Sequence, residues 1–434
     1  MKKQLGFWSV LSLVVGNMVG VGIFVMPSLL APYGSLSLLG WGTTLGGALL
    51  IALVFSKLSS ILPSAGGPYA YARSGFGDFI GFQAAWTYWI SLWVGSTATI
   101  VSTLGYMSIF WPQISTNPVF SFSAGLAVIW GLTFINLISV SFAGRFQIVI
   151  TILKILPLAL LFLFALPHVN VEHFSVVNPS GKPPLTAIIQ VVALTMWGFI
   201  GLECATIPAD YVENPKKTIP RATLWGTLIV GVIYISISAL VIGLVPNDVL
   251  QKTPASFALA AKTIFGQGGA LFVAFAAVLA AIGSLNGWFL VQAQIPLAAA
   301  QDRLFPRKFQ KTTTNGTPAF GLIATAILMS ALLFMNYSKD LIQTFNFMVT
   351  LATLSILITY LFSVLSELML FLEQPQKFRK RDLAKALALT IPATAYILIA
   401  FIGAGQEIVM WGSFLFFASA PVYILVKWQN RVIL

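Results

Sequence analysis

Long apolar segments alternate with short polar stretches along all 434 residues of the chain. A helix needs about 20 mainly apolar residues to cross a bilayer. The pattern predicts twelve such spans, at residues 7–30, 38–61, 78–110, 119–140, 146–166, 186–210, 221–245, 268–300, 318–336, 341–370, 384–403 and 407–429. The predicted fold class is therefore an all-α polytopic membrane protein.

The composition supports this class. Hydrophobic residues make up 58% of the chain and charged residues only 8%, whereas soluble domains carry about 25% charge. The N-terminal run begins like a signal peptide, but its apolar character continues past residue 25 without a small-residue cleavage site, which indicates a retained first span. The single cysteine, Cys204, excludes an internal disulfide, and no Cys/His cluster indicates a metal site or another cofactor.

The basic residues fall mostly on one side of the predicted membrane. If both termini share a side, 19 of the 24 Lys and Arg residues lie there, Lys57 among them, and four lie opposite: Lys182, Lys252, Lys262 and Lys339. This asymmetry predicts that both termini are cytoplasmic. The net charge of +12 is thus a signal of topology and of contact with anionic membrane lipid, not of nucleic-acid binding.

Glycines interrupt the first and the sixth predicted spans. The first contains GNMVGVGIF at residues 16–24, and the sixth contains WGFIGLE at 197–203. Paired interrupted helices in corresponding halves of a chain are typical of a secondary transporter built from an inverted repeat. The predicted organisation is a first repeat of five spans, an inverted second repeat and two additional spans, at 7–166, 186–370 and 384–429.

Interrupted helices leave backbone N–H and C=O groups unpaired within the bilayer, which is tolerated only where they line a cavity. The free N–H groups at the start of a half-helix then suit a carboxylate. The alternative is that the glycines let neighbouring helices approach closely, since Gly16 and Gly20 have the required spacing. Their occurrence in both halves favours the broken helices.

Four motifs resemble the amino acid–polyamine–organocation (APC) family: GNMVGVGIF, SAGGPYAYAR at 64–73, WGFIGLE followed by VENPKKTIPRA, and GSLNGW at 283–288. The resemblance covers essentially the whole chain and is strongest to bacterial exchangers of a basic amino acid for its decarboxylation product. It implies a five-plus-five inverted repeat (LeuT-like) with a central site between spans 1, 3, 6, 8 and 10. It also implies alternating-access transport across a bacterial inner membrane.

The same resemblance implies which residues bind and enclose the substrate. Backbone groups of the first span would hold the carboxylate, at Asn17, Gly20, Val21 and Gly22. The facing wall would come from Trp197, Gly198 and Ile200, with Trp288 attracting a distal cation through its ring face. Aromatic gates would be Tyr88, Trp93 and Tyr360.

Three positions depart from the pattern of the arginine exchangers. Val21 stands where a serine is common, so one hydroxyl near the carboxylate is missing. Ser96 and Ala352 stand where more polar contacts to a guanidinium are expected. These departures argue against arginine itself as the substrate.

Lys154 is placed inside the fifth predicted span, nine residues from Arg145 at its edge. At about 1.5 Å per residue this is roughly 13 Å deep. A charged side chain at a span centre costs at least about 2.5–3.5 kcal/mol on insertion scales. A titratable amine that replaces a coupling sodium ion is one interpretation, and proton-coupled members of the wider family resemble this chain there. A permanently charged, structural lysine is the other.

Two glutamates also fall within predicted spans. Glu203 directly follows the break of the sixth span. It is either a proton carrier or a carboxylate whose hydrogen bonds hold the broken helix, and the sequence leaves both open. Glu367, near the inner end of the tenth span, is expected to be solvated or paired.

The function predicted from these features is secondary active transport of an amino acid or its amine product, by exchange or by proton-coupled uptake. The alternative substrate class is a neutral amino acid, with Lys154 carrying the proton. A channel would need a continuous polar file or a ring of charges. An enzyme would need a nucleophile and base, for which Cys204 beside Glu203 is a faint candidate. Related exchangers are often homodimers, and the sequence does not decide this.

Overall fold

The computed structural model describes residues 5–20, 22–62, 67–138, 159–207, 209, 212–313, 316–373 and 380–431. Within these ranges the secondary structure is helical, apart from an isolated bridge between Leu5 and Val212. The helices are α1 (Phe7–Met18), α2 (Gly22–Leu30), α3 (Leu36–Ile61), α4 (Pro68–Met107), α5 (Gln113–Thr116), α6 (Pro118–Ile138), α8 (Pro184–Thr195), α9 (Pro215–Leu244), α10 (Asn247–Leu250), α11 (Ser256–Gln301), α12 (Ala319–Met335), α13 (Leu341–Glu373), α14 (Lys380–Gly403), α15 (Gln406–Phe417) and α16 (Ser419–Arg431).

Among the described helices, eight are long and apolar enough to cross a membrane, and the bent pair at the start of the chain makes nine. Each predicted range except 146–166 coincides with one of the described helices or a pair of them. Most of the range 146–166 lies outside the described residues. The all-helical membrane architecture is therefore confirmed, and the total of twelve spans stays a prediction.

Two long helices bend at a glycine. α4 bends at Gly77, with φ of 80°, and α11 bends at Gly266, with φ of 65°. Glycine adopts this left-handed backbone without the steric cost that a Cβ would add. The predicted spans beginning at 78 and 268 start directly after these bends, so the sequence located the straight parts of both helices and missed their extensions.

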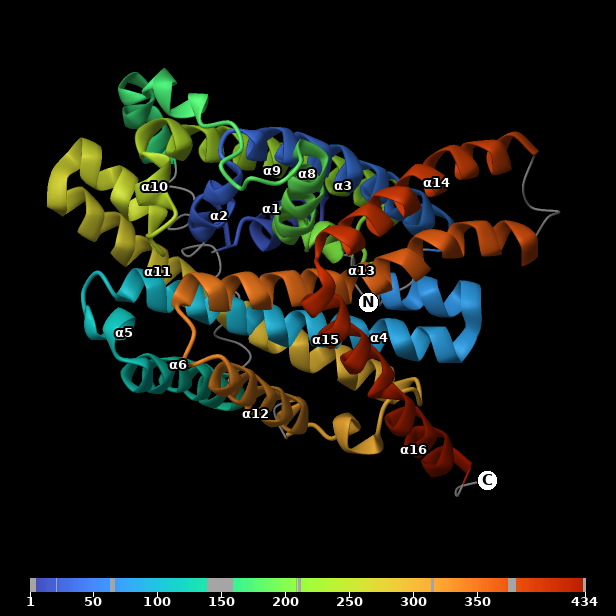
Figure 1. Ribbon diagram of the computed structural model, residues 1–434. Coiled ribbons are helices and arrows are strands. Elements are labelled where there is room, and N and C mark those ends of the chain that lie inside the picture. The colour runs from blue at the N-terminus through green and yellow to red at the C-terminus, as the bar shows by residue number, and fades with distance from the viewer. Residues whose placement is uncertain are drawn as a thin grey trace.

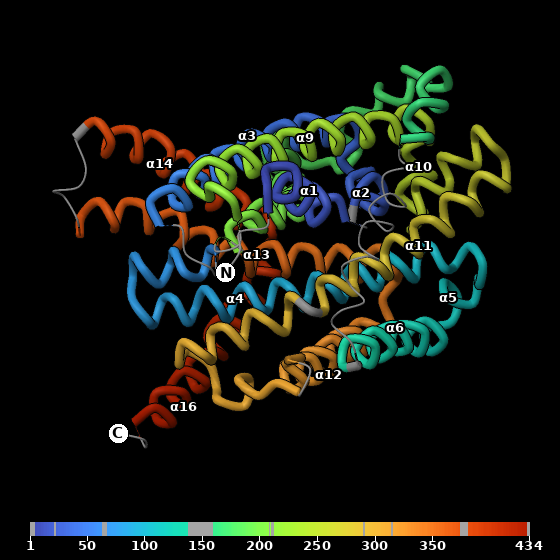
Figure 2. The backbone as a smooth tube through the Cα atoms, turned by 180° about the vertical axis from the view of Figure 1, so that it is seen from behind, coloured from blue at the N-terminus to red at the C-terminus, as the bar shows by residue number. Residues whose placement is uncertain are grey.

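The contacts between helices divide most of the bundle into two groups. We call α1, α3, α8 and α9 the first helix group, and α4, α6, α11 and α12 the second helix group, because apart from contacts with α13 and α14 the main contacts of these helices are within each set. Figures 1 and 2 show the first group above and the second below, with α13 between them. α13 packs along α4 and also contacts α3, α8 and α14, so it joins the two groups.

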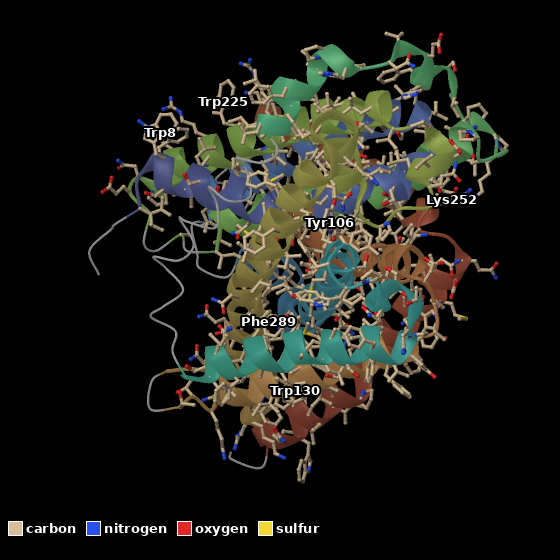
Figure 3. The ribbon with its side chains drawn as sticks, turned by 90° about the vertical axis from the view of Figure 1, so that its left-hand side faces the viewer. Trp8, Tyr106, Trp130, Trp225, Lys252 and Phe289 are labelled. Carbon is tan, nitrogen blue, oxygen red and sulfur yellow. The ribbon has the colours of Figure 1, made fainter. Side chains whose placement is uncertain are left out.

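Large apolar side chains cover the outside of the bundle. Trp8, Trp130 and Trp225 are 76%, 41% and 55% exposed, and they point outward from different helices in Figure 3. Tyr106 and Phe289, labelled in the same view, are fully buried. An apolar exterior of this kind would be unfavourable in water and is stable in lipid.

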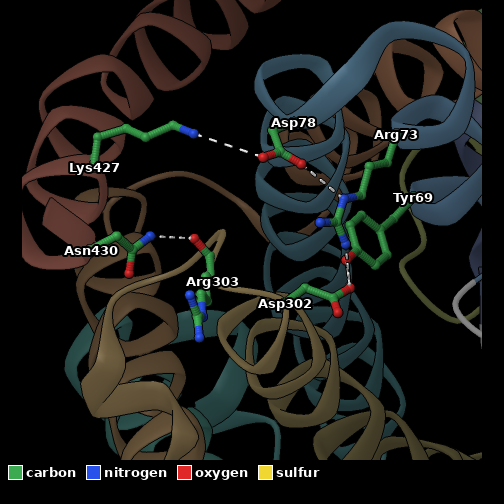
Figure 4. A network of polar contacts seen from close by, with 7 residues as sticks. All are labelled: Tyr69, Arg73, Asp78, Asp302, Arg303, Lys427 and Asn430. Carbon is green, nitrogen blue, oxygen red and sulfur yellow. Dashed lines mark hydrogen bonds and ion pairs between the residues drawn. The ribbon is translucent and has the colours of Figure 1, made fainter. Parts of the chain in front are cut away.

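A polar network ties the C-terminal helix to two others at the end of the bundle where α1 begins and α3 and α13 end, which we call the N-terminal face. Arg73 contacts Asp78 at 3.0 Å and Asp302, at the end of α11, at 2.9 Å. Tyr69 also donates a hydrogen bond to Asp302. Lys427 of α16 reaches Asp78 at 3.8 Å, as Figure 4 shows. These exposed pairs fix the ends of α4, α11 and α16 relative to one another.

Close packing of α3 on α14 gives a direct test of the fold. A Cβ at Gly47 would overlap the ring of Tyr396, whereas one at the neighbouring Gly46 would meet nothing within 4 Å. Overpacking costs about 1–3 kcal/mol, and alanine favours a helix over glycine by about 1 kcal/mol. We expect Gly47→Ala to lower the thermal unfolding midpoint in detergent and Gly46→Ala to leave it unchanged or raise it. Equal midpoints for the two variants would contradict the packing of α3 on α14.

Candidate functional site

The first span is broken where the glycine motif predicts. α1 ends at Met18 and α2 begins at Gly22, and the two halves differ in direction by 42°. The amide of Gly20 donates to the carbonyl of Met18 at 2.7 Å, which stops the helical ladder. A Cβ at Gly16 would meet nothing within 4 Å, and one at Gly20 only the Met18 carbonyl, at 3.8 Å. The alternative that these two glycines serve close helix packing is therefore wrong.

Side chains from other helices bond the carbonyls near this break. The hydroxyl of Tyr234, on α9, donates to the carbonyl of Met18 at 2.5 Å. The hydroxyls of Tyr106 on α4 and Ser256 on α11 both donate to the carbonyl of Phe24, at 2.7 Å and 2.8 Å. Unpaired backbone groups are costly in a bilayer, so these three hydroxyls stabilise the two half-helices in their bent arrangement.

The sixth span is broken as well, and its break lies against the first. α8 ends at Thr195, a 3₁₀ turn follows, and Gly201 has φ of 112° before a second 3₁₀ turn begins. Only glycine adopts this left-handed backbone easily. A Cβ on Gly201 would lie 3.3 Å from Met18 Cγ and 3.4 Å from Asn17 Cβ. The two interrupted segments predicted from the sequence are thus in contact.

A small cavity lies beside these breaks, between the two helix groups. The first group and its 3₁₀ turn contribute Asn17, Met18, Gly20, Trp197, Gly198, Ile200 and Tyr234. The second group contributes Ser91, Leu92, Gly95, Ser96, Thr99, Ser284 and Trp288. No side chain in these two sets is charged. The cavity therefore offers backbone groups, hydroxyls and aromatic faces to a bound molecule.

Two tryptophans face the cavity from opposite groups. The ring of Trp197 lies so close to the backbone of Gly95 that a Cβ on Gly95 would overlap it. Trp288, on α11, is half-buried and lines the other wall. An aromatic face can attract a cationic group or cover an apolar one. Asn17, Gly20, Gly198 and Ile200 join them in the lining, as the sequence predicted.

Ser91 is a lining residue that the sequence did not single out. Its side chain is 1% exposed, and its hydroxyl has no hydrogen-bond partner among the described residues. A buried polar group without a partner is costly, so a hydroxyl left free in a cavity wall is suited to a ligand. No signal in the sequence distinguishes Ser91, since α4 carries several serines and threonines along its buried length.

Glu203 lies three residues beyond the lining residue Ile200, toward the N-terminal face, and is fully buried. Its carboxylate accepts hydrogen bonds from the hydroxyls of Tyr88 at 2.8 Å and Tyr360 at 2.5 Å, and from the amide of Gly201 at 2.9 Å. These bonds join the broken sixth span to α4 and α13. The bond to Gly201 holds the break itself, as one of the two interpretations of Glu203 requires.

The remaining predicted site residues are Trp93, Gly22, Val21 and Lys154. Trp93 is buried but does not line the cavity, and its indole nitrogen has no partner among the described residues. Gly22 begins α2. Val21 and Lys154 fall outside the described residues. Of the other two positions that depart from the arginine exchangers, Ser96 lines the cavity and the buried Ala352 does not.

Two broken spans that contact each other beside a cavity between two helix groups define a membrane protein of the secondary-transporter class. The chain belongs to the amino acid permease family, whose family model matches residues 5–427. It is a multi-pass membrane protein and a transporter. The enzyme and channel alternatives are set aside by this membership. Within the described ranges, no group of three or more His, Cys, Asp or Glu side chains is arranged to hold a metal ion.

Curated relatives with similar sequences are antiporters and transporters. The cadaverine/lysine antiporter of Escherichia coli (strain K12) is 31% identical over 76% of this chain and 74% of its own length. A putative arginine/ornithine antiporter of Bacillus subtilis is 31% identical over 98% of this chain and 97% of its own. The putrescine transporter PotE of Escherichia coli (strain K12) is 30% identical, over 98% and 96%.

A solved structure with the same fold is the manganese transporter of Eremococcus coleocola, in complex with an aromatic bis-isothiourea substituted compound. The two chains superpose with a TM-score of 0.60 at 14% sequence identity, over 99% of this chain and 96% of the other. This likeness confirms the LeuT-like fold class predicted from the sequence.

The free hydroxyl of Ser91 gives a test of the cavity. We expect Ser91→Ala to raise the KM of transport about three- to tenfold, the effect of losing one hydrogen bond to a bound substrate. Ser102→Ala is the matched control, because Ser102 is also buried on α4 with an unpartnered hydroxyl but does not line the cavity. The KM of each variant is measured from initial uptake rates over a range of substrate concentrations. Equal KM values for the two variants would mean that the substrate does not contact this wall.

Proposed function

We propose that the protein is a secondary active exchanger of an amino acid for a second amino acid or its amine product, working by alternating access at the cavity. The observation that carries this proposal is the position of the cavity. Both broken spans line one wall and α4 and α11 line the other, so a relative movement of the two helix groups changes the side from which the cavity is reached. Such movement around a fixed midplane site is how transporters built from repeats work.

The substrate carboxylate is proposed to bind at the break of the first span. The first N–H groups of α2, from Gly22 onward, have no partner within their own helix, and the positive end of the helix dipole lies there. Gly20 lines the cavity beside this end. Trp197 and Gly198 line the same wall, and the hydroxyl of Ser91 on the opposite wall is available to the rest of the substrate.

The cluster of Glu203, Tyr88 and Tyr360 is proposed as a gate on the side of the N-terminal face. Its hydrogen bonds connect the first helix group to the second and to α13. Because the three side chains are fully buried, a substrate leaving on that side has to separate them. Glu203 and Lys154 are the proposed proton-carrying groups in this scheme.

A basic amino acid and its amine product are the proposed substrates. The relatives named above are described as antiporters or transporters of lysine, cadaverine, arginine, ornithine and putrescine. In the cavity a distal ammonium would meet the face of Trp288 and the hydroxyl of Ser96. A compact ammonium suits this wall better than a guanidinium, which presents a wide planar set of donors.

A proton-coupled symporter of neutral amino acids is the second candidate. The uncharged lining of the cavity favours it, because no carboxylate among these residues would pair with a distal ammonium. In this case Lys154 would carry the coupling proton. A bacterial inner membrane, with both termini cytoplasmic, is proposed for either candidate from the distribution of basic residues, and a homodimer from the resemblance alone.

Counterflow uptake into proteoliposomes tests the proposal and separates the two candidates. Labelled lysine, ornithine, arginine, cadaverine, putrescine, alanine and leucine are offered to vesicles that are empty or preloaded with the unlabelled compound, with and without a pH gradient. We expect saturable uptake of lysine or ornithine only into preloaded vesicles. Arginine is expected to exchange more slowly.

Two results would contradict the exchanger. Accumulation of a neutral amino acid in empty vesicles under an inward proton gradient, abolished in Lys154→Ala, would establish the symporter instead. Flux that rises linearly with concentration and shows no stimulation by preloading would exclude both candidates.

A further inference from the structure

A buried ion pair connects α3 to α13 near the N-terminal face. The Nζ of Lys57 lies 2.6 Å from Oε1 of Glu367, whose side chain is fully buried. Thr390, on α14, donates to Oε2 of the same carboxylate at 2.9 Å, and the Lys57 ammonium lies 5.1 Å from the ring centroid of Phe371. The sequence pattern places Lys57 among the basic residues on the side of the termini and does not predict this pair. Lys57 lies in the last two turns of α3, where the carboxylate compensates its charge within the bundle.

Burying this pair adds little to stability by itself. Removing two charges from water is costly, and their attraction offsets the cost only when the geometry is good and the remaining oxygens are hydrogen-bonded. Oε2 of Glu367 accepts a hydrogen bond from Thr390, while Oε1 lies in ion-pair contact with Lys57 without a hydrogen bond to it. Losing either partner would leave a buried charge unpaired, and so would sliding α13 by one turn along α3. The pair therefore fixes one axial register of α13 against α3.

This register determines where one face of α13 points. Tyr360, Ser363 and Glu367 are three and four residues apart, so their side chains lie on the same face of the helix. Each bonds a different element. Tyr360 donates to Glu203, Ser363 donates to the carbonyl of Pro68 at 2.7 Å, and Glu367 pairs with Lys57.

A second contact links α3 to the same face. The ring of Phe55, on α3, meets the ring of Tyr360 edge-on, with centroids 5.3 Å apart. Phe55 limits the sideways position of the Tyr360 ring, but an apolar edge contact tolerates axial sliding. The ion pair does not tolerate it, because sliding would separate two charged atoms that are both buried.

We propose that Lys57 and Glu367 are positioning residues for the gate. Their ion pair holds α13 in the register that keeps the Tyr360 hydroxyl on Glu203, and so keeps the N-terminal face of the cavity closed in this conformation. The inference rests on the proposed gate and deepens it. It attributes the stability of the closed conformation to an ion pair that lies about two helical turns from the Tyr360 hydroxyl.

The chain contains its own reporter for this gate. Cys204 is its single cysteine, is buried, and directly follows Glu203. Opening the gate exposes the segment around Cys204, so the rate at which a membrane-impermeant maleimide labels this thiol measures opening without reference to transport. The reagent is added from each side in turn to vesicles whose orientation is determined by a C-terminal tag.

We expect Glu367→Gln and Lys57→Met to raise the labelling rate from the N-terminal face about fivefold or more, because the closed state loses the contact that favours it. The rate from the opposite side should stay unchanged or fall. The exchanged pair Lys57→Glu/Glu367→Lys should return the rate to within about twofold of wild type. A residue needed only for folding would not be rescued by exchanging the charges.

Lys427→Met is the matched control, because it removes a lysine from an exposed pair at the same face that does not involve α13. It is expected to label like the wild type. Tyr360→Phe is the positive control and should label faster, and Cys204→Ala should not label at all. Thr390→Val leaves the ion pair in place and serves if the single charge variants fail to fold.

The inference is overturned if the folded charge variants label at the wild-type rate while Tyr360→Phe labels faster. It is also overturned if the exchanged pair folds but labels as fast as the single variants. Where the single variants cannot be made, it is overturned if Thr390→Val, which removes the hydrogen bond to Oε2 of Glu367, leaves the rate unchanged. If Tyr360→Phe also labels at the wild-type rate, the proposed gate is wrong and the inference fails with it. Counterflow exchange by the same samples shows separately whether the transport function holds.

Discussion

Unpaired backbone groups in a bilayer must find partners, and this constraint organises the centre of the molecule. The first and sixth spans stop being helical at Met18–Gly20 and at Ile200–Gly201. Hydroxyls from α4, α9 and α11 bond the carbonyls on both sides of the first break, and Glu203 bonds the amide of Gly201 in the second. The backbone groups bonded in this way no longer lack a partner in the bilayer. The polar groups of the two breaks that remain unbonded are available to a substrate.

The proposed transport mechanism depends on the division of the bundle into two helix groups that meet at the cavity. The hydrogen bonds to Glu203 and the van der Waals contact of Trp197 with Gly95 cross the boundary beside the cavity. In the proposed mechanism, a relative rotation of the groups breaks these contacts on one side. α13 contacts both groups, and its register would couple the position of the proposed gate to the packing of α3.

The sequence predicted most of the membrane-spanning helices and some of the residues that line the cavity. Apolar length located the spans, and paired glycines located both breaks, because these features are local in the chain. Trp197 and Trp288 came from motif resemblance. Ser91 could not be found, because a free hydroxyl differs from a bonded one only in three dimensions. The pairing of Lys57 with Glu367 was missed for a similar reason: each looked like a charge near a membrane edge until α3 and α13 were placed together.

The central claim is that the substrate binds between the two helix groups at the broken spans. A cryo-electron-microscopy map of the protein in lipid nanodiscs, with the compound that shows the strongest counterflow, tests it most directly. The account predicts ligand density between the start of α2 and α11, with its carboxylate end within hydrogen-bond distance of the first N–H groups of α2 and its other end at Trp288. Density only outside this cavity, or an unoccupied cavity at saturating substrate, would contradict the account.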